Sequence, residues 1–282
     1  MSPMTAVVDS ASCPPERELR AAALLALCVA EPLAKVAAVQ ALADLREVDP
    51  HAVLIPPADL PGRPARPALV APGKVRQRAL GSTQGRAALF HALAHIEFNA
   101  INLALDIMWR YPGMPPAFYR QWATVAAEEA MHFQLLSAHL AGLGSAYGDF
   151  PAHDGLWDMA EKTRDDLLAR LALVPRTLEA RGLDASPLIK DKLLLAGDPA
   201  GAAILDIILR DEIGHVAVGN HWFRQLCRER HDEPIAAYAR VAAQHEAPRL
   251  RGPFNLPARR AAGFTEDELQ VLLAGSSQSI VA

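Results

Sequence analysis

Residues 128–132 read EEAMH and residues 211–215 read DEIGH, so one acid-Glu-x-x-His pattern occurs twice in the chain. In each copy the second acid and the histidine are three positions apart. On a helix this spacing places both side chains on one face, one turn from each other, where they can reach one metal ion or the edge of an ion pair. Glu128 is rotated by about 100° from Glu129 and is the weaker candidate ligand.

Both motifs lie on an apolar helix face, where an unpaired charge is unfavourable. Apolar residues at helical spacing flank the motifs, with Phe118, Trp122, Val125, Phe133 and Leu136 around the first and Leu205, Ile208, Val216, Gly219 and Phe223 around the second. Burying a lone ionised carboxylate costs several kcal/mol or shifts its pKa until the group is neutral. The Glu and His of each motif therefore need a cation or hydrogen-bonding partners.

Two further acids show the same conflict between charge and apolar surroundings. Glu97 lies in the middle of the apolar face of its helix. Glu179 lies on a weaker stripe that also admits Glu161 and Asp165. Pro175 is expected to bend this helix just before Glu179, because proline removes a backbone donor and clashes with the preceding turn.

Spacing along the chain links these acids into a repeat. Glu97 precedes Glu129 by 32 positions, and Glu179 precedes Glu212 by 33. This predicts a duplicated helical hairpin, in which two hairpins pack with their acidic faces inward. The predicted metal ligands are Glu97, Glu129, His132, Glu179, Glu212 and His215. Four carboxylates balance two divalent cations, and the oxygen and nitrogen ligands favour iron, with manganese as the alternative, over zinc.

The chain is predicted to be all-α, with a four-helix bundle between helical extensions. Long helices are expected at residues 82–110, 116–142, 155–181 and 199–230, with weaker ones at 16–45 (interrupted at Pro32), 235–245 and 265–274. We expect four parts: an N-terminal helical extension at 1–55, a Pro-rich connector at 56–80, the bundle at 81–231 and a C-terminal helical extension at 232–282. The connector should lie on the bundle as a solvated strap, with a docking segment as the alternative.

Composition and charge exclude several classes of protein. With 51% hydrophobic and 21% charged residues among 282, the chain can bury a large core and is not disordered as a whole. A net charge of -4 gives no global basic field, so nucleic acid is not an expected partner. Three scattered cysteines argue against a disulfide framework. The apolar run at 21–30 is too short to span a membrane and lacks the layout of a signal peptide, so we expect a cytoplasmic protein without a membrane partner.

Other polar residues are less suited to binding the metal. A stripe on the first long helix lies on the side opposite its predicted ligand and comprises His91, His95, Asn99, Asn102 and Asp106. It is expected to be a solvated or helix-packing face, with a second functional surface as the alternative. Within it, His95 is a candidate for orienting a ligand.

Three further histidines have other expected roles. His139 is expected to be a core residue satisfied by a backbone carbonyl, with a place in the metal cavity as the alternative. His153 should cap or brace the third long helix, and His221 should lie on the surface.

The set of six predicted ligands resembles that of the di-iron carboxylate proteins of the ferritin-like superfamily. The phrases AHIEFNAINLALD (94–106), YGDFPAHDGLWDMAEKT (147–163), LEARGLD (178–184), ILRDEIGHVAVGNHWF (208–223) and RGPFN (251–255) are similar to a bacterial family of ferritin-like proteins of unknown function. The resemblance spans about residues 75–265. It implies a ferritin-like fold and these six ligands, with Glu129 and Glu212 bridging the metals and Glu97 and Glu179 as terminal ligands.

The leading functional hypothesis is an O2-dependent oxidase or hydroxylase that acts on a small molecule through a di-iron centre. Open coordination positions at such a centre are needed for the reaction. A ferroxidase or iron-handling protein is one alternative, and a binding protein in which the metal only braces the fold is another. Because the superfamily includes hydroxylases of modified tRNA and the connector is basic, tRNA is a minor alternative substrate. No catalytic residue beyond the ligands is predicted, and the sequence points to no particular electron donor or oligomeric state.

Overall fold

The computed structural model describes residues 17–75 and 78–277, and every named element within them is a helix. This agrees with the predicted all-α class. Extended pairing in the described residues is limited to two isolated bridges, Glu18 with Glu47 and Leu69 with Ala152. Predictions that fall on residues 1–16, 76–77 and 278–282 lie outside the described part.

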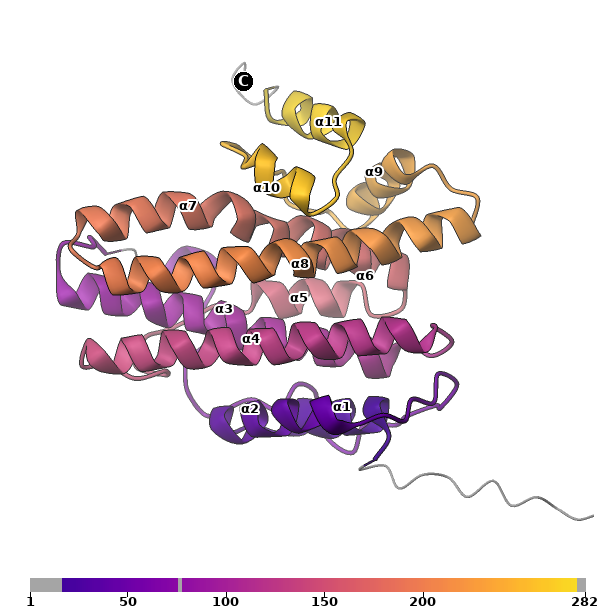
Figure 1. Ribbon diagram of the computed structural model, residues 1–282, viewed down its shortest axis with the longest axis horizontal. Coiled ribbons are helices and arrows are strands. Elements are labelled where there is room, and N and C mark those ends of the chain that lie inside the picture. The colour runs from indigo at the N-terminus through magenta and orange to yellow at the C-terminus, as the bar shows by residue number, and fades with distance from the viewer. Residues whose placement is uncertain (1–16, 76–77, 278–282) are drawn as a thin grey trace, which may run out of the picture.

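Long helices lie side by side and form the body of the molecule (Figure 1). They include α3 (Thr83–Arg110), α4 (Pro116–Gly142) and α8 (Pro199–Glu229), close to the predicted bounds. The most extensive contacts join α3 to α4, and α7 (Ala180–Leu195) to α8. Proline at the start of α4 and α8 supplies no backbone donor where none is needed, which explains why these helices begin there.

The prediction of one continuous helix over residues 155–181 is wrong. The segment contains α5 (Gly155–Lys162), α6 (Leu167–Leu173) and a π-helical turn, η3 (Val174–Glu179), which continues into α7. Asp166 starts α6 by accepting a hydrogen bond from the backbone of Leu168. The expected bend at Pro175 takes the form of the π-helical turn, in which the wider hydrogen-bond spacing accommodates the missing donor.

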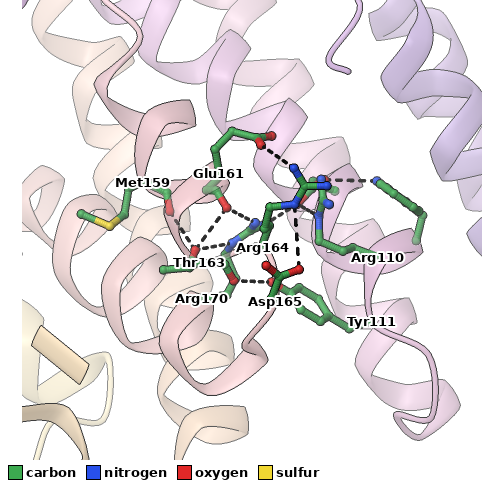
Figure 2. Close-up of polar contacts among 11 residues, drawn as sticks. Arg110, Tyr111, Met159, Glu161, Thr163, Arg164, Asp165 and Arg170 are labelled. Atoms are coloured by element: carbon green, nitrogen blue, oxygen red, sulfur yellow. Dashed lines mark hydrogen bonds and ion pairs between the residues drawn. The ribbon is translucent and has the colours of Figure 1, made fainter. Parts of the chain in front are cut away.

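The break between α5 and α6 is closed by a buried polar network (Figure 2). Arg170 donates from Nε to the hydroxyl of Thr163 (3.0 Å), and Tyr111 donates its hydroxyl hydrogen to the backbone carbonyl of Thr163 (2.9 Å). Arg170 also pairs with Asp106 of α3, which is itself paired with Arg110. This network fixes the start of α6 relative to α3, although the chain is not helical there.

An N-terminal layer covers one side of α3 and α4 (Figure 1). It consists of α1 (Leu19–Cys28), α2 (Pro32–Ala41) and the short turn η1 (Leu42–Asp44). The following connector contains the turn η2 (Pro72–Lys74) and lies on the body as a strap. It is held by backbone hydrogen bonds from Gly62 to Leu27, and between Val70 and Ala152.

A C-terminal cap lies beside α8 on the opposite side of the molecule (Figure 1). It contains α9 (Pro234–Gln244), α10 (Leu256–Ala261) and α11 (Glu266–Ser277). Helix α10 was not predicted from the sequence; Asn255 is its N-cap residue. The side chain of Asn255 accepts a hydrogen bond from the backbone of Ala258.

By length and composition, α3 is apolar enough to cross a membrane, but 72% of its most apolar window is buried inside the fold. At these buried positions, α3 is covered by other residues of the chain. A mostly buried helix of this kind is typical of the core of a soluble protein.

The polar stripe on α3 is also buried, from His91 to Asp106, so it is a packing face and not a solvated one.

Candidate metal centre

Four buried side chains from three helices meet at the centre of the molecule. Glu97 comes from α3, Glu129 and His132 from α4, and Glu212 from α8. Each offers one ligand atom, and these atoms all lie within 4.8 Å of one another. Helical spacing places Glu129 and His132 one turn apart, as the sequence pattern requires. The cluster could hold a metal ion.

His215 and Glu179 lie beside this cluster. His215 places Nδ1 2.9 Å from Oε1 of Glu129 and 3.7 Å from Oε1 of Glu212. Glu179 ends η3, and burial raises the pKa of its carboxyl well above the usual range, with further increases from the charges of Glu212 and Glu129. All six predicted ligands are therefore in or next to one cluster.

Close approach between η3 and α8 places Glu179 there. A Cβ at position 219 would lie 2.5 Å from Cβ of Pro175, so only glycine allows this contact. Gly219 thus admits the proline ring of the π-helical turn. Because Glu179 lies four residues after Pro175 at the end of η3, this contact brings it close to Glu212 of α8.

Several polar atoms of the cluster are buried without a hydrogen-bond partner. They are Oε2 of Glu97, Oε1 of Glu129, Oε2 of Glu179, Oε2 of Glu212 and Nδ1 of His215. Some lie near one another, as Nδ1 of His215 and Oε1 of Glu129 do, but their orientation does not form a hydrogen bond. Unsatisfied buried polar atoms are rare in folded proteins, and a set of them facing one point suits a bound ion.

The carboxyl groups repel one another in this arrangement. Burial raises the pKa of Glu97 well above its usual range, and the charge of Glu129 raises it further. The pKa of Glu212 is also raised by burial and then by Glu129. Ionised forms of these acids are unfavourable unless positive charge is added, which is the condition that a divalent cation satisfies.

The two histidines partly compensate these acids. Burial opposes the charged form of His132, but its hydrogen bond to Glu129 and the nearby carboxyl of Glu97 raise its pKa to about 11. The pKa of His215 is likewise raised well above the usual range, against burial, by Glu129 and Glu128. For Glu129, burial acts to raise the pKa, yet His215 and His132 together lower it. A metal bound here would replace these imidazole protons.

The imidazole of each histidine also pairs with an acid on the other helix, namely the residue just before the glutamate of that helix's Glu-x-x-His motif. His132 places Nε2 3.1 Å from Oδ2 of Asp211, and His215 places Nε2 2.7 Å from Oε2 of Glu128. Because a carboxylate only accepts, Nε2 carries the proton in both rings, which turns Nδ1 toward the acidic cluster. The bracing roles of Glu128, considered above only as a weaker ligand, and of Asp211 were not predicted, although the repeated acid before each Glu was the available signal.

Other histidines do not join the cluster. His95 bonds to the hydroxyl of Tyr147 and to the carbonyl of His153, so the expectation that it orients a metal ligand is wrong. His139 lies 2.9 Å from a carboxylate oxygen of Asp198, so its expected backbone partner is also wrong. His153 accepts a hydrogen bond from the backbone of Gly155 at the start of α5, and His221 is exposed, as predicted.

Comparison with known proteins gives a family but no activity. Residues 28–270 match the family described as "Protein of unknown function (DUF455)". An uncharacterized protein of Haemophilus influenzae is 46% identical over 223 residues, which are 77% of this chain and 77% of that protein. No solved structure matches the chain significantly.

Proposed function

The chain belongs to the family of proteins of unknown function DUF455, and we propose that it is a di-metal carboxylate protein that uses O2 to oxidise or hydroxylate a small molecule. In this proposal the long helices form a ferritin-like bundle over residues 81–231. The N-terminal helices, the connector at 56–80 and the C-terminal helices are additions to it. Iron is the proposed metal, with manganese as the alternative.

The observation that carries the proposal is the group of buried, unpartnered ligand atoms contributed by Glu97, Glu129, Glu179, Glu212 and His215. With His132, they form four carboxylates and two imidazoles, which balance the charge of two divalent cations. A single cation would leave excess negative charge in a buried site, which is unfavourable. The duplicated Glu-x-x-His motifs supply the two halves of the site from α4 and α8.

The side chains have distinct proposed roles. As in the ferritin-like proteins that the ligand set resembles, Glu129 and Glu212 would be shared by the two metals, and Glu97 and Glu179 would each serve one. His132 and His215 are oriented for ligation by Asp211 and Glu128. Bound iron(II) would supply electrons for the reduction of O2. The apolar walls of α3, α4 and α8 keep water from the cluster.

Oxygen uptake tests this function directly. Full-length protein loaded anaerobically with two equivalents of Fe(II) is expected to consume O2 and to change its optical spectrum on exposure to air. Glu97→Gln, which keeps the side-chain shape, should lose this activity, whereas Glu161→Gln, at a partly exposed position of α5, should retain it. If the loaded wild-type protein takes up no O2, the oxidase proposal is wrong.

The same experiment separates two alternatives that share the ligand set. A ferroxidase or iron-handling protein would consume O2 in proportion to added Fe(II), and would accumulate Fe(III) without needing an organic substrate. A protein braced by its metal would bind two ions and gain stability but would show no O2 uptake. The oxidase or hydroxylase proposal instead requires turnover beyond the bound iron when an electron donor and substrate are supplied.

A further inference from the structure

The C-terminal cap contains a partly open cavity of about 280 Å³, and none of the clustered acids or histidines lines it. Most of its walls are apolar, and they come from α9, α11 and residues 247–250. Ala242, Leu250, Val271 and Leu272 are among them. The volume lies near the lower end of the ~300–1,000 Å³ typical of ligand pockets, so the cavity fits a small molecule and not a folded partner.

A buried arginine forms part of the cavity wall. Arg176 is 4% exposed, and its Nη2 donates to Oε1 of Glu268 at 2.8 Å. The other guanidinium nitrogens, Nε and Nη1, are buried and have no hydrogen-bond partner. The guanidinium lies over the rings of Phe223 and Phe264, with centroid distances of 4.3 and 5.2 Å, but aromatic faces compensate a buried cation only partly.

Positive charge exceeds negative charge around this cavity. Its lining contains Arg176, Arg249 and Arg259 but a single acid, Glu268. Glu268 is shared, since Arg224 also pairs with it at 3.5 Å. Arg259 is satisfied by Asp184 outside the lining, and exposed Arg249 has no ion pair in the described part of the chain. Of the three lining arginines, Arg249 therefore has no acid partner among the described residues, and Arg176 shares its acid with Arg224.

We propose that this cavity binds a small amphipathic organic anion, with its carboxylate or phosphate group on Arg176 and Arg249 and its apolar part between α9 and α11. An anion would accept hydrogen bonds from the unpartnered donors of Arg176, as guanidinium geometry favours. A neutral apolar molecule would leave those donors unsatisfied. A cation would face the excess of arginines.

The cavity also adjoins the segment that carries Glu179. Arg176 belongs to η3, and the next residue, Thr177, shares a 2.9 Å hydrogen bond with the hydroxyl of Tyr238 on the cavity wall. A ligand in the cavity would thus contact the same π-helical turn that ends at Glu179. The binding proposal itself does not depend on metal at the acidic cluster, and it can be tested without one.

Isothermal titration calorimetry of the full chain, before and after treatment with a chelator, tests the proposal. Octanoate is expected to bind with one site per chain, at least about tenfold more tightly than octan-1-ol or octylamine, and equally well in both preparations. Octyl phosphate serves as a second anionic probe, and the tighter of the two anions identifies the preferred headgroup. Equal affinity for octanoate and octan-1-ol, absence of octanoate binding, or binding lost with the metal would overturn the proposal.

Matched variants locate the ligand. Ala242→Phe should fill the cavity and abolish octanoate binding, whereas Ala243→Phe, on the exposed side of the same helix, should not. Arg249→Gln should weaken binding about threefold, and Arg251→Gln, which is exposed and outside the lining, should leave it unchanged. Unchanged binding in folded Ala242→Phe would contradict the assignment.

Arg176→Met tests the headgroup contact. Glu268 keeps Arg224 as a partner in this variant, so the protein is expected to fold. Its preference for octanoate over octan-1-ol should disappear. Circular dichroism reports the fold of each variant, and a preference that persists in folded Arg176→Met would show that this arginine does not hold the anion.

Discussion

Helix α3 buries acids on two opposite faces, and the two faces differ in how the charge is compensated. On one face, Asp106 is fully buried and forms ion pairs with Arg110 at 2.6 Å and Arg170 at 2.5 Å. On the other, Glu97 is also buried, but no Lys or Arg pairs with it in the described residues, and the nearest cationic group is the imidazole of His132, whose Nδ1 lies 3.5 Å from Oε2. The burial of an acid therefore does not by itself indicate a metal site. The absence of a Lys or Arg counterion is the distinguishing feature.

The largest expected effect comes from removing the paired charge. Asp106→Asn leaves the guanidinium of buried Arg170 without its counterion, and we expect a loss of about 3–5 kcal/mol in the free energy of unfolding. Urea denaturation measures it, and the loss should be the same with and without metal. Glu161→Gln, at a 41% exposed position, is the control and should change stability by less than about 0.5 kcal/mol.

The equivalent substitution on the other face should behave in the opposite way. In metal-free protein, Glu97→Gln removes a repelled carboxyl and should leave the free energy of unfolding unchanged or slightly higher. Metal at one hundred times its dissociation constant should stabilise the wild type by about 2.7 kcal/mol and Glu97→Gln much less. Thermal unfolding with and without Mn(II) measures the difference. A loss of stability in metal-free Glu97→Gln as large as that in Asp106→Asn would contradict the comparison.

Smaller effects are expected from the acids that orient the histidines. Asp211→Asn and Glu128→Gln each weaken the hold on one imidazole, so the affinity for metal should fall about tenfold. Competition with a metal-binding dye measures this change. Asp206→Asn is the matched control. Asp206 lies on α8, as Asp211 does, and pairs with Lys190 of α7 at an exposed position. Equal affinities in all three variants would show that the histidines do not ligate.

The last expected effect is gradual and concerns the pH dependence of the metal-free protein. The pKa of His132 is about 11 in the folded chain, against 6.5 when unfolded, and the pKa values of Glu97, Glu179 and Glu212 are raised as well. Between pH 7 and 9 the folded state therefore binds at least one proton more than the unfolded state, so its stability should fall by at least about 1.4 kcal/mol per pH unit. Urea denaturation across this range measures the slope. Metal binding should release protons and become tighter as pH rises.

Much of the candidate metal cluster was predictable because it depends on local spacing. Glu-x-x-His on an apolar face is visible in the sequence, and helix geometry brings Glu129 and His132 together. The break at Thr163 was not predictable in this way, because it depends on Arg170 reaching across to Thr163. The bend at Pro175 was predicted, but its π-helical form depends on the contact between Pro175 and Gly219. Both are tertiary contacts that override helix propensity.

The polar stripe of α3 shows the same limit. Periodicity placed it correctly opposite Glu97, but whether it met water or protein depended on distant segments. Lys35 of α2 donates to Asn102, and Tyr147, from the loop after α4, contacts His95. The cross-bracing of His132 by Asp211 likewise depends on how α8 packs against α4.

Metal analysis of the full chain tests the central claim most directly. Protein purified without added metal, then loaded with Fe(II) or Mn(II) and freed of excess, should contain two metal ions per chain by inductively coupled plasma mass spectrometry. Glu97→Gln should contain fewer, and Asp106→Asn, if folded, should still contain two. A wild-type protein that retains no metal, and whose thermal unfolding is unaffected by either ion, would contradict the claim that the buried acids form a di-metal centre.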